Sequence, residues 1–182
     1  MEHAVDARSP AVVRRQDTGH DRRMFVLKPP APLVLPEGTP TVFLAGSIEM
    51  GQAEDWQSVL TNELGMLDVI VLNPRRDAWD ATWRQRIDEP AFREQVEWEL
   101  TGLDRSDVIA MWFAPETAAP ITLLELGLHV RDRKVVVGCP DGYWRKGNVE
   151  VVCARFGIDV HGDWPAFVAA VTQAITRRAD RS

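Results

Sequence analysis

Two glutamates stand in apolar surroundings in this sequence, and buried carboxylates are candidates for acid–base and nucleophilic chemistry. Glu99 lies on the hydrophobic stripe of a predicted helix over residues 90–103. The stripe consists of Phe92, Val96, Leu100 and Leu103. Because a carboxylate on a buried face needs a partner or has a raised pKa, Glu99 is a candidate acid. The alternative is a structural pair with a buried donor such as an arginine.

Glu125 is the second of these glutamates. It lies within the segment 121–128, which is apolar on nearly every face and is therefore expected to form a central helix. Near the amino end of that helix, the dipole favours an ionised carboxylate while the leucines exclude water. These conditions suit a nucleophile, whereas the alternative is a buried carboxylate that is paired for structure.

Two loops that follow predicted strands carry candidate substrate contacts. The glycine-containing segment 46–51 suits close backbone approach to a ligand, although it lacks the spacing and the lysine of a phosphate-binding loop. The loop 73–83 combines two arginines, two aspartates and two tryptophans, which suit sugar or phosphate oxygens and base stacking. A solvated loop whose tryptophans pack on the domain is the alternative. The candidate substrate-binding residues are Gly46, Ser47, Ile48, Arg75, Trp79 and Asp80.

Other reactive residue types give no second site. Cys139 and Cys153 have neither the number nor the spacing of a disulfide framework or a zinc site, so we expect reduced thiols. No histidine is paired with a nucleophile, which argues against a Ser-His or Cys-His triad. Asp107, at the start of a predicted strand, is expected to be a turn or cap residue. We expect neither a metal nor an organic cofactor.

Alternating apolar runs and amphipathic segments from residue 41 onward predict βα units around a parallel sheet. The expected strands are Val42–Ala45, Val69–Leu72, Val108–Trp112, Val135–Val137 and Ile158–Val160. The expected helices are Ala53–Leu64, Pro90–Leu103, Pro120–Arg131, Gly147–Phe156 and Pro165–Thr176. This spacing favours a flavodoxin-like, doubly wound five-stranded parallel sheet in a three-layer α/β/α arrangement. In such a fold the ligand crevice lies beyond the carboxyl ends of the strands.

The first forty residues differ from the rest. Residues 1–23 mix charges without apolar periodicity and predict a mobile arm, which leaves 24–182 as the domain. Five prolines between residues 24 and 40 favour an extended strap or edge on the domain surface. The whole chain has 182 residues and a formal charge of −6 without a basic stripe, which argues against duplex nucleic acid as a partner. No apolar run is long enough to span a membrane, so a cytoplasmic location is expected.

Several segments together resemble the nucleoside 2-deoxyribosyltransferase family over roughly residues 40–160. They are Phe43-Leu44-Ala45-Gly46-Ser47-Ile48, Asn73-Pro74-Arg75-Arg76, Glu97-Trp98-Glu99, Ser106-Asp107-Val108-Ile109 and Ile121-Thr122-Leu123-Leu124-Glu125-Leu126-Gly127. The resemblance implies a homo-oligomeric enzyme in which Glu125 attacks the anomeric carbon, forming a covalent glycosyl-glutamate. It implies that Glu99 contacts the leaving base, at a position where characterised members carry aspartate. It also implies that the sugar is transferred to another free nucleobase.

Two positions qualify the resemblance. The family tends to carry an aspartate six residues before the nucleophile, where this chain has Ala119. Asn148 matches an asparagine that a neighbouring subunit contributes in the family; the alternative is a cap for a helix beginning near Val149. Tyr143 and Trp144, in a glycine-flanked loop, are expected to be exposed at a subunit interface. Two further functions remain open, an N-glycosidase for nucleosides or nucleotides with water as acceptor and a noncatalytic nucleotide-binding sensor.

Overall fold

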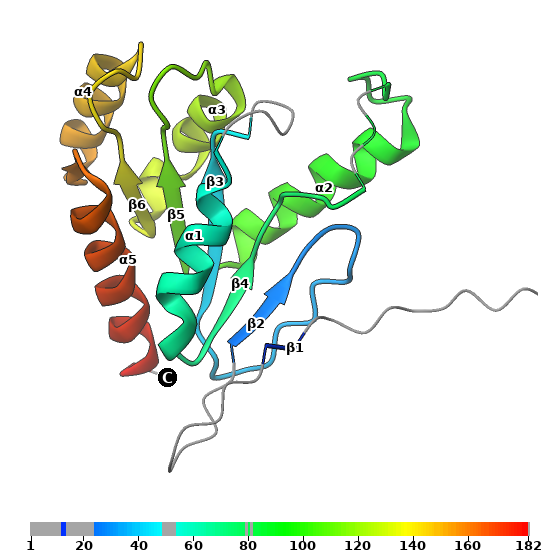
Figure 1. The fold of residues 1–182 in the computed structure, drawn as a ribbon, viewed down its shortest axis with the longest axis horizontal. Coiled ribbons are helices and arrows are strands. Elements are labelled where there is room, and N and C mark those ends of the chain that lie inside the picture. Colours follow the sequence, from blue (N-terminus) through cyan, green and yellow to red (C-terminus); the bar gives the residue numbers. More distant parts are fainter. Residues whose placement is uncertain (1–11, 14–23, 49–53, 79, 81, 182) are drawn as a thin grey trace, which may run out of the picture.

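The computed structural model describes residues 12–13, 24–48, 54–78, 80 and 82–181. Its centre is a seven-stranded sheet in the order β1-β2-β4-β3-β5-β6-β7 (Figure 1). The strands are β1 Val12–Val13, β2 Met24–Leu27, β3 Thr41–Gly46, β4 Val69–Leu72, β5 Val108–Trp112, β6 Val135–Gly138 and β7 Val160–His161. The six strands from β2 to β7 are parallel to their neighbours, and β1 pairs antiparallel with β2.

Five α-helices cover the two faces of the sheet. They are α1 Trp56–Glu63, α2 Pro90–Arg105, α3 Pro120–His129, α4 Lys146–Phe156 and α5 Trp164–Ala179. Apolar residues of α1 and α5, including Trp56 and Phe167, form one hydrophobic core with the sheet. Residues of α2, α3 and α4 form a second core on the opposite face, with Leu103, Leu126 and Cys153 among them. The predicted three-layer arrangement is therefore confirmed for the described residues.

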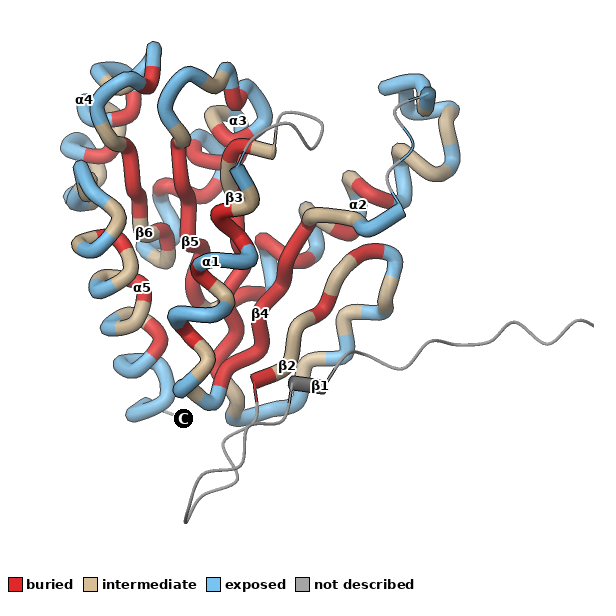
Figure 2. The backbone as a smooth tube through the Cα atoms, viewed as in Figure 1, coloured by how far each residue is buried: buried red, intermediate tan, exposed pale blue. Residues whose placement is uncertain are grey.

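The central strands are buried throughout because helices cover both of their faces. Every residue of β4 and β5 is buried, which explains why they are continuous hydrophobic runs without alternation (Figure 2). The order β4-β3-β5-β6-β7 confirms the flavodoxin-like winding predicted for these five strands. Helices α2 and α3 also begin at their predicted prolines, which suit the first helical turn.

The predicted number of parallel strands was one too few. Residues 24–27 form a sixth parallel strand, with Met24 opposite Val69 and Leu27 opposite Leu72. The proline-rich segment that follows β2 lies against α2, because Trp98 Nε1 donates to the carbonyl oxygen of Ala31 at 2.8 Å. The segment thus combines the two predicted possibilities, a strand near the sheet edge followed by a strap.

Some element boundaries also differ from the prediction. The last strand is Val160–His161, two residues beyond the predicted start at Ile158. Val12–Val13 form a strand within the predicted mobile arm, and the rest of that arm lies outside the described residues. Helix α3, expected to be central, is buried on one side only, because Ile121, Leu124 and Leu128 are more than half exposed.

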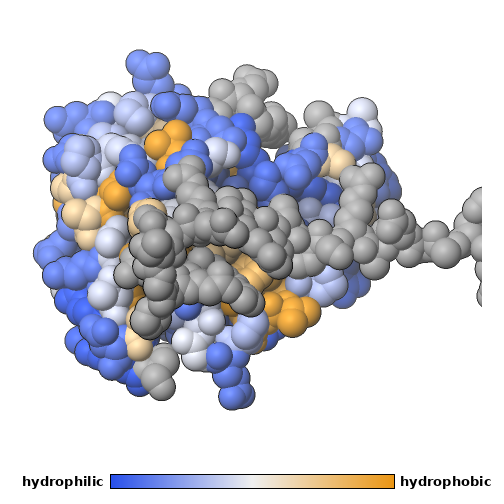
Figure 3. Space-filling view, turned by 60° about the horizontal axis from the view of Figure 1, so that its bottom comes forward, coloured by the Kyte–Doolittle hydropathy of each residue, from blue (hydrophilic) through white to orange (hydrophobic). Residues whose placement is uncertain are grey.

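Where described residues are visible in Figure 3, hydrophilic residues predominate around the periphery, and several hydrophobic patches lie between them. Among the described residues, no helix has the length and apolar character needed to cross a membrane. The carboxyl ends of the parallel strands lie at one edge of the sheet, from which the loops after β3, β4 and β5 project (Figure 1). These loops contain most of the predicted substrate contacts.

Candidate active site

Helices α2 and α3 bring the two predicted carboxylates together. Glu125, on α3, is only 8% exposed. Burial and the neighbouring charge of Glu99, on α2, raise the pKa of Glu125 to about 8. Burial likewise raises the pKa of Glu99, although a hydrogen bond from Gln95 opposes that rise. The charge of Glu99 therefore adds to the effect of burial on the ionisation of Glu125.

The pKa of Glu125 differs from the expectation that the helix dipole keeps this group ionised. Glu125 is the sixth residue of α3, and the dipole acts mainly on the first turn. Desolvation and repulsion from Glu99 therefore outweigh the dipole. In the free protein at neutral pH, the Glu125 carboxyl group is mainly protonated.

Gln95 is a site residue that the sequence reasoning missed. Its buried side-chain amide donates to Glu99 Oε1 at 2.8 Å and to the carbonyl oxygen of Pro74 at 2.9 Å. Gln95 therefore links the carboxylate pair to the loop after β4. One signal was available, since Gln95 precedes Glu99 by four residues and so lies one helical turn away on the same face.

The buried face of α2 is rotated from the predicted stripe. It contains Gln95, Trp98, Gly102 and Leu103, whereas Leu100 is 40% exposed. Gly102 fits here because a Cβ would lie 2.8 Å from the ring of Phe43. Glu99 still borders this face, between Trp98 and Gly102, which accounts for its partial burial.

Replacing Gln95 by leucine is expected to move the first ionisation of the carboxylate pair to higher pH. The hydrogen bond from Gln95 favours the ionised form of Glu99, so its loss raises the pKa of Glu99 further. The acidic limb of the pH–rate profile for base release measures this shift. An unchanged limb in a folded Gln95→Leu protein would leave Gln95 with a packing role only.

Ser47 joins the loops that follow β3 and β5. The Ala114 amide donates to Ser47 Oγ at 3.2 Å, and Thr117 Oγ1 donates to the Ala114 carbonyl oxygen at 2.8 Å. Because the Thr117 proton is used there, Ser47 is the donor in its 2.7 Å hydrogen bond with Thr117. The Ser47 proton is thus already engaged within the chain, and the hydroxyl fixes the spacing of the two loops.

Gly46 is required by packing within this chain. A Cβ on Gly46 would lie 2.5 Å from the Trp112 carbonyl oxygen and 2.5 Å from Trp56 Cζ2. The Trp56 ring is fixed there because its Nε1 donates to the Ser47 carbonyl oxygen at 3.1 Å. Ile48 is half-buried beside them, and residues 49–53 of the predicted glycine loop lie outside the described residues.

Arg75 and Arg76 hold the loop after β4 to two different helices. Arg75 Nη1 lies 3.7 Å from Asp55 Oδ1 and donates to Gln57 Oε1 at 3.4 Å, both at the start of α1. Arg76 Nη1 forms a 3.0 Å ion pair with Glu94 on α2. The Arg76 guanidinium also lies 5.0 Å from the centre of the Trp83 ring. Trp83 therefore contacts Arg76 of the same loop, and substrate binding by Arg75 stays a prediction.

Asp80 caps its own turn. Its Oδ1 accepts from the Thr82 amide at 2.9 Å and from the Thr82 hydroxyl at 2.7 Å, and these hydrogen bonds lower the pKa of Asp80. The Asp80 residue is exposed, and its predicted partner in ligand binding, Trp79, lies outside the described residues. A substrate contact by either residue remains a prediction.

Three buried polar side-chain atoms have no hydrogen-bond partner among the described residues. They are Gln57 Nε2, Arg76 Nε and Gln95 Oε1. All three belong to residues that contact, or lie within, the segment 74–76 after β4. These atoms lie near the end of β4, next to the loop that contains the predicted substrate contact Arg75.

One family model matches the sequence of this chain. It is described as nucleoside 2-deoxyribosyltransferase like and covers residues 39–143, more than half of the chain. The chain belongs to the nucleoside 2-deoxyribosyltransferase-like family. No curated protein matches the sequence. The family resemblance found in the sequence is thereby confirmed, and the matched span contains Glu99, Glu125 and the loops after β3, β4 and β5.

The departure from the family at Ala119 lies in a constrained turn. Ala119 precedes α3 in the left-handed region, with φ 41°, and is 5% exposed. The Tyr143 hydroxyl and Trp144 Nε1 both donate to the Ala118 carbonyl oxygen at 3.1 Å. Glu116, the acidic residue three positions before Ala119, is exposed.

The loop before α4 differs in part from its prediction. Tyr143 is buried against Phe113, with ring centres 4.9 Å apart, so its expected exposure was wrong. Trp144 is 61% exposed, as predicted. Helix α4 begins at Lys146, so Asn148 lies inside its first turn and does not cap it. Asn148 is exposed and lies beyond the span matched by the family model.

Asp107 and His129 have hydrogen-bond partners within the chain, whereas the two cysteines are free thiols. Asp107 Oδ2 accepts from the amide and the hydroxyl of Thr41, both at 2.9 Å, which confirms its turn or cap role. Cys139 and Cys153 are free buried thiols, and burial raises the pKa of each to about 11. His129 Nδ1 lies 2.9 Å from Asp132 Oδ2. Among the described residues, no group of three or more metal-binding side chains lies together.

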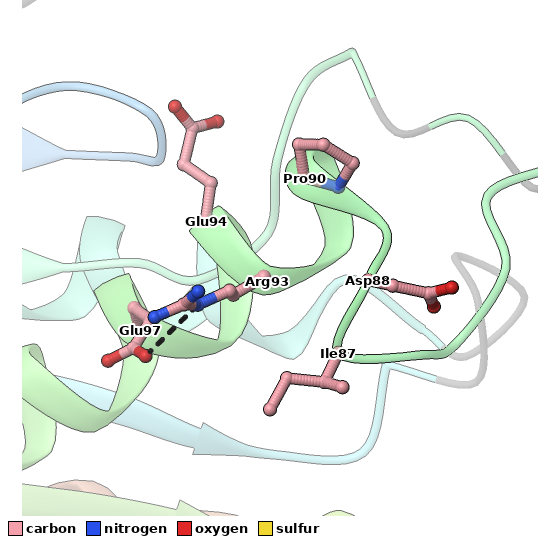
Figure 4. Close-up of a pocket in the computed structure, with 6 residues that line it drawn as sticks. All are labelled: Ile87, Asp88, Pro90, Arg93, Glu94 and Glu97. Atoms are coloured by element: carbon pink, nitrogen blue, oxygen red, sulfur yellow. Dashed lines mark ion pairs between the residues drawn. The ribbon is translucent and has the colours of Figure 1, made fainter.

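A depression of about 450 Å³ lies at the start of α2, and its lining includes neither Glu99 nor Glu125. Its lining residues are Ile87, Asp88, Pro90, Arg93, Glu94 and Glu97 (Figure 4). Ile87 is 82% exposed, and the Arg93–Glu97 ion pair of 3.6 Å borders the depression. Because these side chains are exposed and ordinary surface groups, we place the candidate chemistry at the buried pair Glu99 and Glu125.

Proposed function

We propose that this protein cleaves the N-glycosidic bond of a nucleoside or deoxynucleoside and transfers the sugar to another base. Glu125 is the nucleophile and Glu99 the acid that protonates the leaving base. The observation that carries this proposal is the pair of neighbouring buried carboxylates with raised pKa values. Membership of the nucleoside 2-deoxyribosyltransferase-like family supports the same chemistry.

The proposed reaction needs one ionised and one protonated carboxyl group, and a pair that holds a single proton supplies both. Between the two ionisations, the pair holds one proton, which leaves one carboxylate as a potential nucleophile and the other as an acid. In the free protein the Gln95 hydrogen bond favours the anion on Glu99. We propose that positive charge developing at the anomeric carbon draws the anion to Glu125, so that the proton moves to Glu99.

The reaction then proceeds by two displacements. A Glu125 carboxylate oxygen forms a bond to C1′ as the bond between C1′ and the base nitrogen breaks, and the departing nitrogen takes the proton from Glu99. A second base then attacks C1′ and releases Glu125, while the Glu99 carboxylate accepts the proton of the incoming base. This division of work between two carboxylates is that of a retaining glycosidase.

We assign substrate binding to the loops at the carboxyl edge of the sheet. Gly46, Ser47 and Ile48 form the wall nearest to α3 and its preceding loop, because Ser47 is bonded to that loop. Arg75, with Trp79 and Asp80 further along the same loop, is assigned to the sugar side. Asn148 of a neighbouring copy completes the site in this proposal.

Ala119 favours hydrolysis as the second candidate function. Where the family tends to carry an aspartate, this chain offers only a methyl group at the start of α3. A base held by fewer polar contacts is a weaker competitor against water for the glycosyl-enzyme. The same position makes a noncatalytic nucleotide-binding sensor a third outcome to be tested.

One incubation distinguishes these functions. The protein is mixed with deoxynucleosides or their 5′-phosphates, with and without a second free base, and the products are separated by chromatography. Exchange products support the transferase, and base release that needs no acceptor supports the hydrolase. A raised melting temperature without turnover would reject the enzyme and support the sensor.

Replacing Glu99 by glutamine is expected to change the shape of the pH–rate profile. In the wild type, activity requires one proton on the pair, so the profile is bell-shaped, with its alkaline limb near pH 8. Glu99→Gln removes the acid and also the charge that raises the pKa of Glu125. The ionisation of Glu125 therefore moves to lower pH, the alkaline limb disappears, and bases that leave only when protonated react most slowly.

The matched control is Glu97→Gln, two residues earlier on the exposed side of α2. It keeps the wild-type profile because its side chain is 63% exposed and forms an ion pair with Arg93. If the pH–rate profile of Glu99→Gln equals that of the wild type, Glu99 has only a structural role.

A further inference from the structure

Three basic side chains lie where the neighbouring strands β2 and β4 end. Lys28 directly follows β2, and Arg75 and Arg76 lie in the loop after β4. The two strand ends are joined, because the Asn73 amide donates to the Leu27 carbonyl oxygen at 2.9 Å. The three basic side chains are only 33%, 20% and 12% exposed. Positive charge is therefore partly buried at this part of the carboxyl edge, in a chain whose formal charge is −6.

Asp55, just before α1, lies within reach of two of these charges. Its Oδ1 is 3.7 Å from Arg75 Nη1. Burial alone would raise the pKa of Asp55, but hydrogen bonds from Ser58 lower it. The charges of Arg75 and Lys28 lower the pKa further. The two basic residues thus act on one common point, although they follow different strands.

The acidic partners of the basic residues are the more exposed members of their ion pairs. Lys28 Nζ lies 2.6 Å from Asp77, whose side chain is 81% exposed. Arg76 pairs with Glu94, whose side chain is 54% exposed. Ion pairs in which one member is so exposed contribute little stability, so a doubly charged anion can replace these carboxylates at small cost. The Arg76 guanidinium is held more firmly, because it also packs over the Trp83 ring.

Two buried hydrogen-bond donors beside the basic residues have no acceptor among the described residues. They are Arg76 Nε and Gln57 Nε2. Gln57, at the start of α1, is completely buried, and its Oε1 accepts from Arg75 Nη1 at 3.4 Å. Because that hydrogen bond identifies the oxygen of the amide, the other amide atom is the nitrogen and is a donor. The cluster therefore leaves two donors unused.

An anion with several acceptor oxygens fits this combination of groups. Guanidinium groups bind phosphate through parallel N–H···O hydrogen bonds, and lysine binds it as a point charge. The unused donors of Arg76 and Gln57 supply further hydrogen bonds to the same oxygens. A metal cation does not fit, because the three basic side chains repel it.

Gln95 connects this cluster to the carboxylate pair. Its amide donates to the Pro74 carbonyl oxygen, next to Arg75, and to Glu99 Oε1. Its own Oε1 is buried without a partner among the described residues, so it can accept from a hydroxyl group. A ligand that spans the region has the bond to be cleaved at one end, a sugar hydroxyl in the middle and an anionic group at the other end. A nucleoside 5′-phosphate has its groups in this order.

We propose that Lys28, Arg76 and Gln57 bind the 5′-phosphate of a nucleotide, so that nucleoside 5′-monophosphates are the preferred substrates. The phosphate oxygens replace the exposed carboxylates beside Lys28 and Arg76, and they accept from Gln57 Nε2 and Arg76 Nε. Arg75 adds its charge at the same point. The choice of substrate rests on the proposed function, whereas binding of the phosphate does not require turnover.

Calorimetric titration of the Glu125→Ala protein tests the phosphate site without turnover. Each common deoxynucleoside and its 5′-monophosphate are compared as ligands. At least one monophosphate is expected to bind roughly tenfold or more tightly than its nucleoside, as one hydrogen bond between charged groups provides. Adding Lys28→Gln or Arg76→Gln is expected to reduce this ratio of affinities by a similar factor.

Arg177→Gln is the matched control. It removes the same charge as Arg76→Gln from an exposed position on α5, where Arg177 donates to Gln173. The ratio of affinities is expected to equal that of the parent protein. Arg76→Gln can disturb packing because its side chain is largely buried, whereas Lys28→Gln alters a side chain that is one-third exposed. Far-ultraviolet circular dichroism verifies the fold of each variant.

Base release by the wild type from the same pairs of compounds separates the two proposals. Faster release from the monophosphates supports both the phosphate site and the reaction. Tighter binding of the monophosphates without any base release would reject the proposed function and keep the phosphate site. The phosphate site is overturned if no monophosphate binds more tightly than its nucleoside, or if Lys28→Gln and Arg76→Gln proteins that fold both keep the preference.

Discussion

The Glu125→Ala protein is expected to lose base release by roughly a thousandfold or more, because the reaction then has no nucleophile. Binding of the nucleoside is expected to survive, since the contacts assigned to the loops after β3 and β4 remain. Product chromatography at a fixed substrate concentration measures turnover, and a substrate-induced change in melting temperature measures binding. A fluorinated sugar that reacts slowly is expected to label the wild type at Glu125.

The raised pKa of Glu125 also predicts how the stability of the folded protein depends on pH. The folded-state pKa of Glu125, about 8, lies above its usual 4.5. The wild type therefore has the full stability of a protonated Glu125 below pH 4.5 and loses it progressively as the pH rises through 8. Glu125→Gln lacks this titration, so its stability relative to the wild type increases over that range. At about 1.4 kcal/mol per pKa unit, the gain is on the order of a few kcal/mol.

Glu97→Ala is the matched control for the loss of activity. It removes an exposed carboxylate from α2 and is expected to keep wild-type turnover. Substantial base release by a folded Glu125→Ala protein, or labelling of a different residue by the fluorinated sugar, would show that Glu125 is not the nucleophile.

The sequence predicted those strands and helices that can be identified from the apolar pattern of their own residues. Runs such as Val69–Leu72 are buried on both faces, so their apolar continuity identified them without tertiary information. The strand Met24–Leu27 was not separated from the prolines that follow it, because four residues carry too weak a pattern alone. Its identity as a strand depends on pairing with β4, forty-five residues further along the chain.

The two carboxylates of the site could be predicted from the sequence, but the residues that contact them could not. Glu99 and Glu125 were identifiable because a charged residue interrupts an apolar segment. Gln95 was missed because its importance comes from contacts with both Glu99 and the Pro74 carbonyl group. The pKa of Glu125 is raised by burial and also by Glu99 on another helix, whereas the sequence indicated only the dipole and the apolar residues of its own helix.

The loop after β4 illustrates a third limit. Arginines and tryptophans in the segment 73–83 suit a ligand in the sequence, yet Arg76 pairs with Glu94 and packs on Trp83. The sequence of a charged residue looks the same whether the residue binds a ligand or pairs with another part of the chain. Only the position of the neighbouring helix distinguishes the two.

Mixing two inactive variants is expected to restore activity if Asn148 completes the site of a neighbouring copy. Asn148→Ala and Glu125→Ala are each expected to be inactive alone. After subunit exchange, a mixed dimer contains one site with Glu125 from one chain and Asn148 from the other. Random exchange of equal amounts makes half of the dimers mixed, with one of two sites intact, so about a quarter of wild-type activity returns.

A control for this experiment uses two residues that act together within one protomer. Glu99 and Glu125 interact in the same protomer, so mixing Glu99→Gln with Glu125→Ala gives no dimer with an intact pair. If Asn148 acted on Glu125 of its own chain, the first mixture would fail in the same way. Recovery in the Asn148 mixture alone therefore establishes a shared site. Continued inactivity despite verified subunit exchange would confine Asn148 to its own helix, where it is an exposed residue in the first turn of α4.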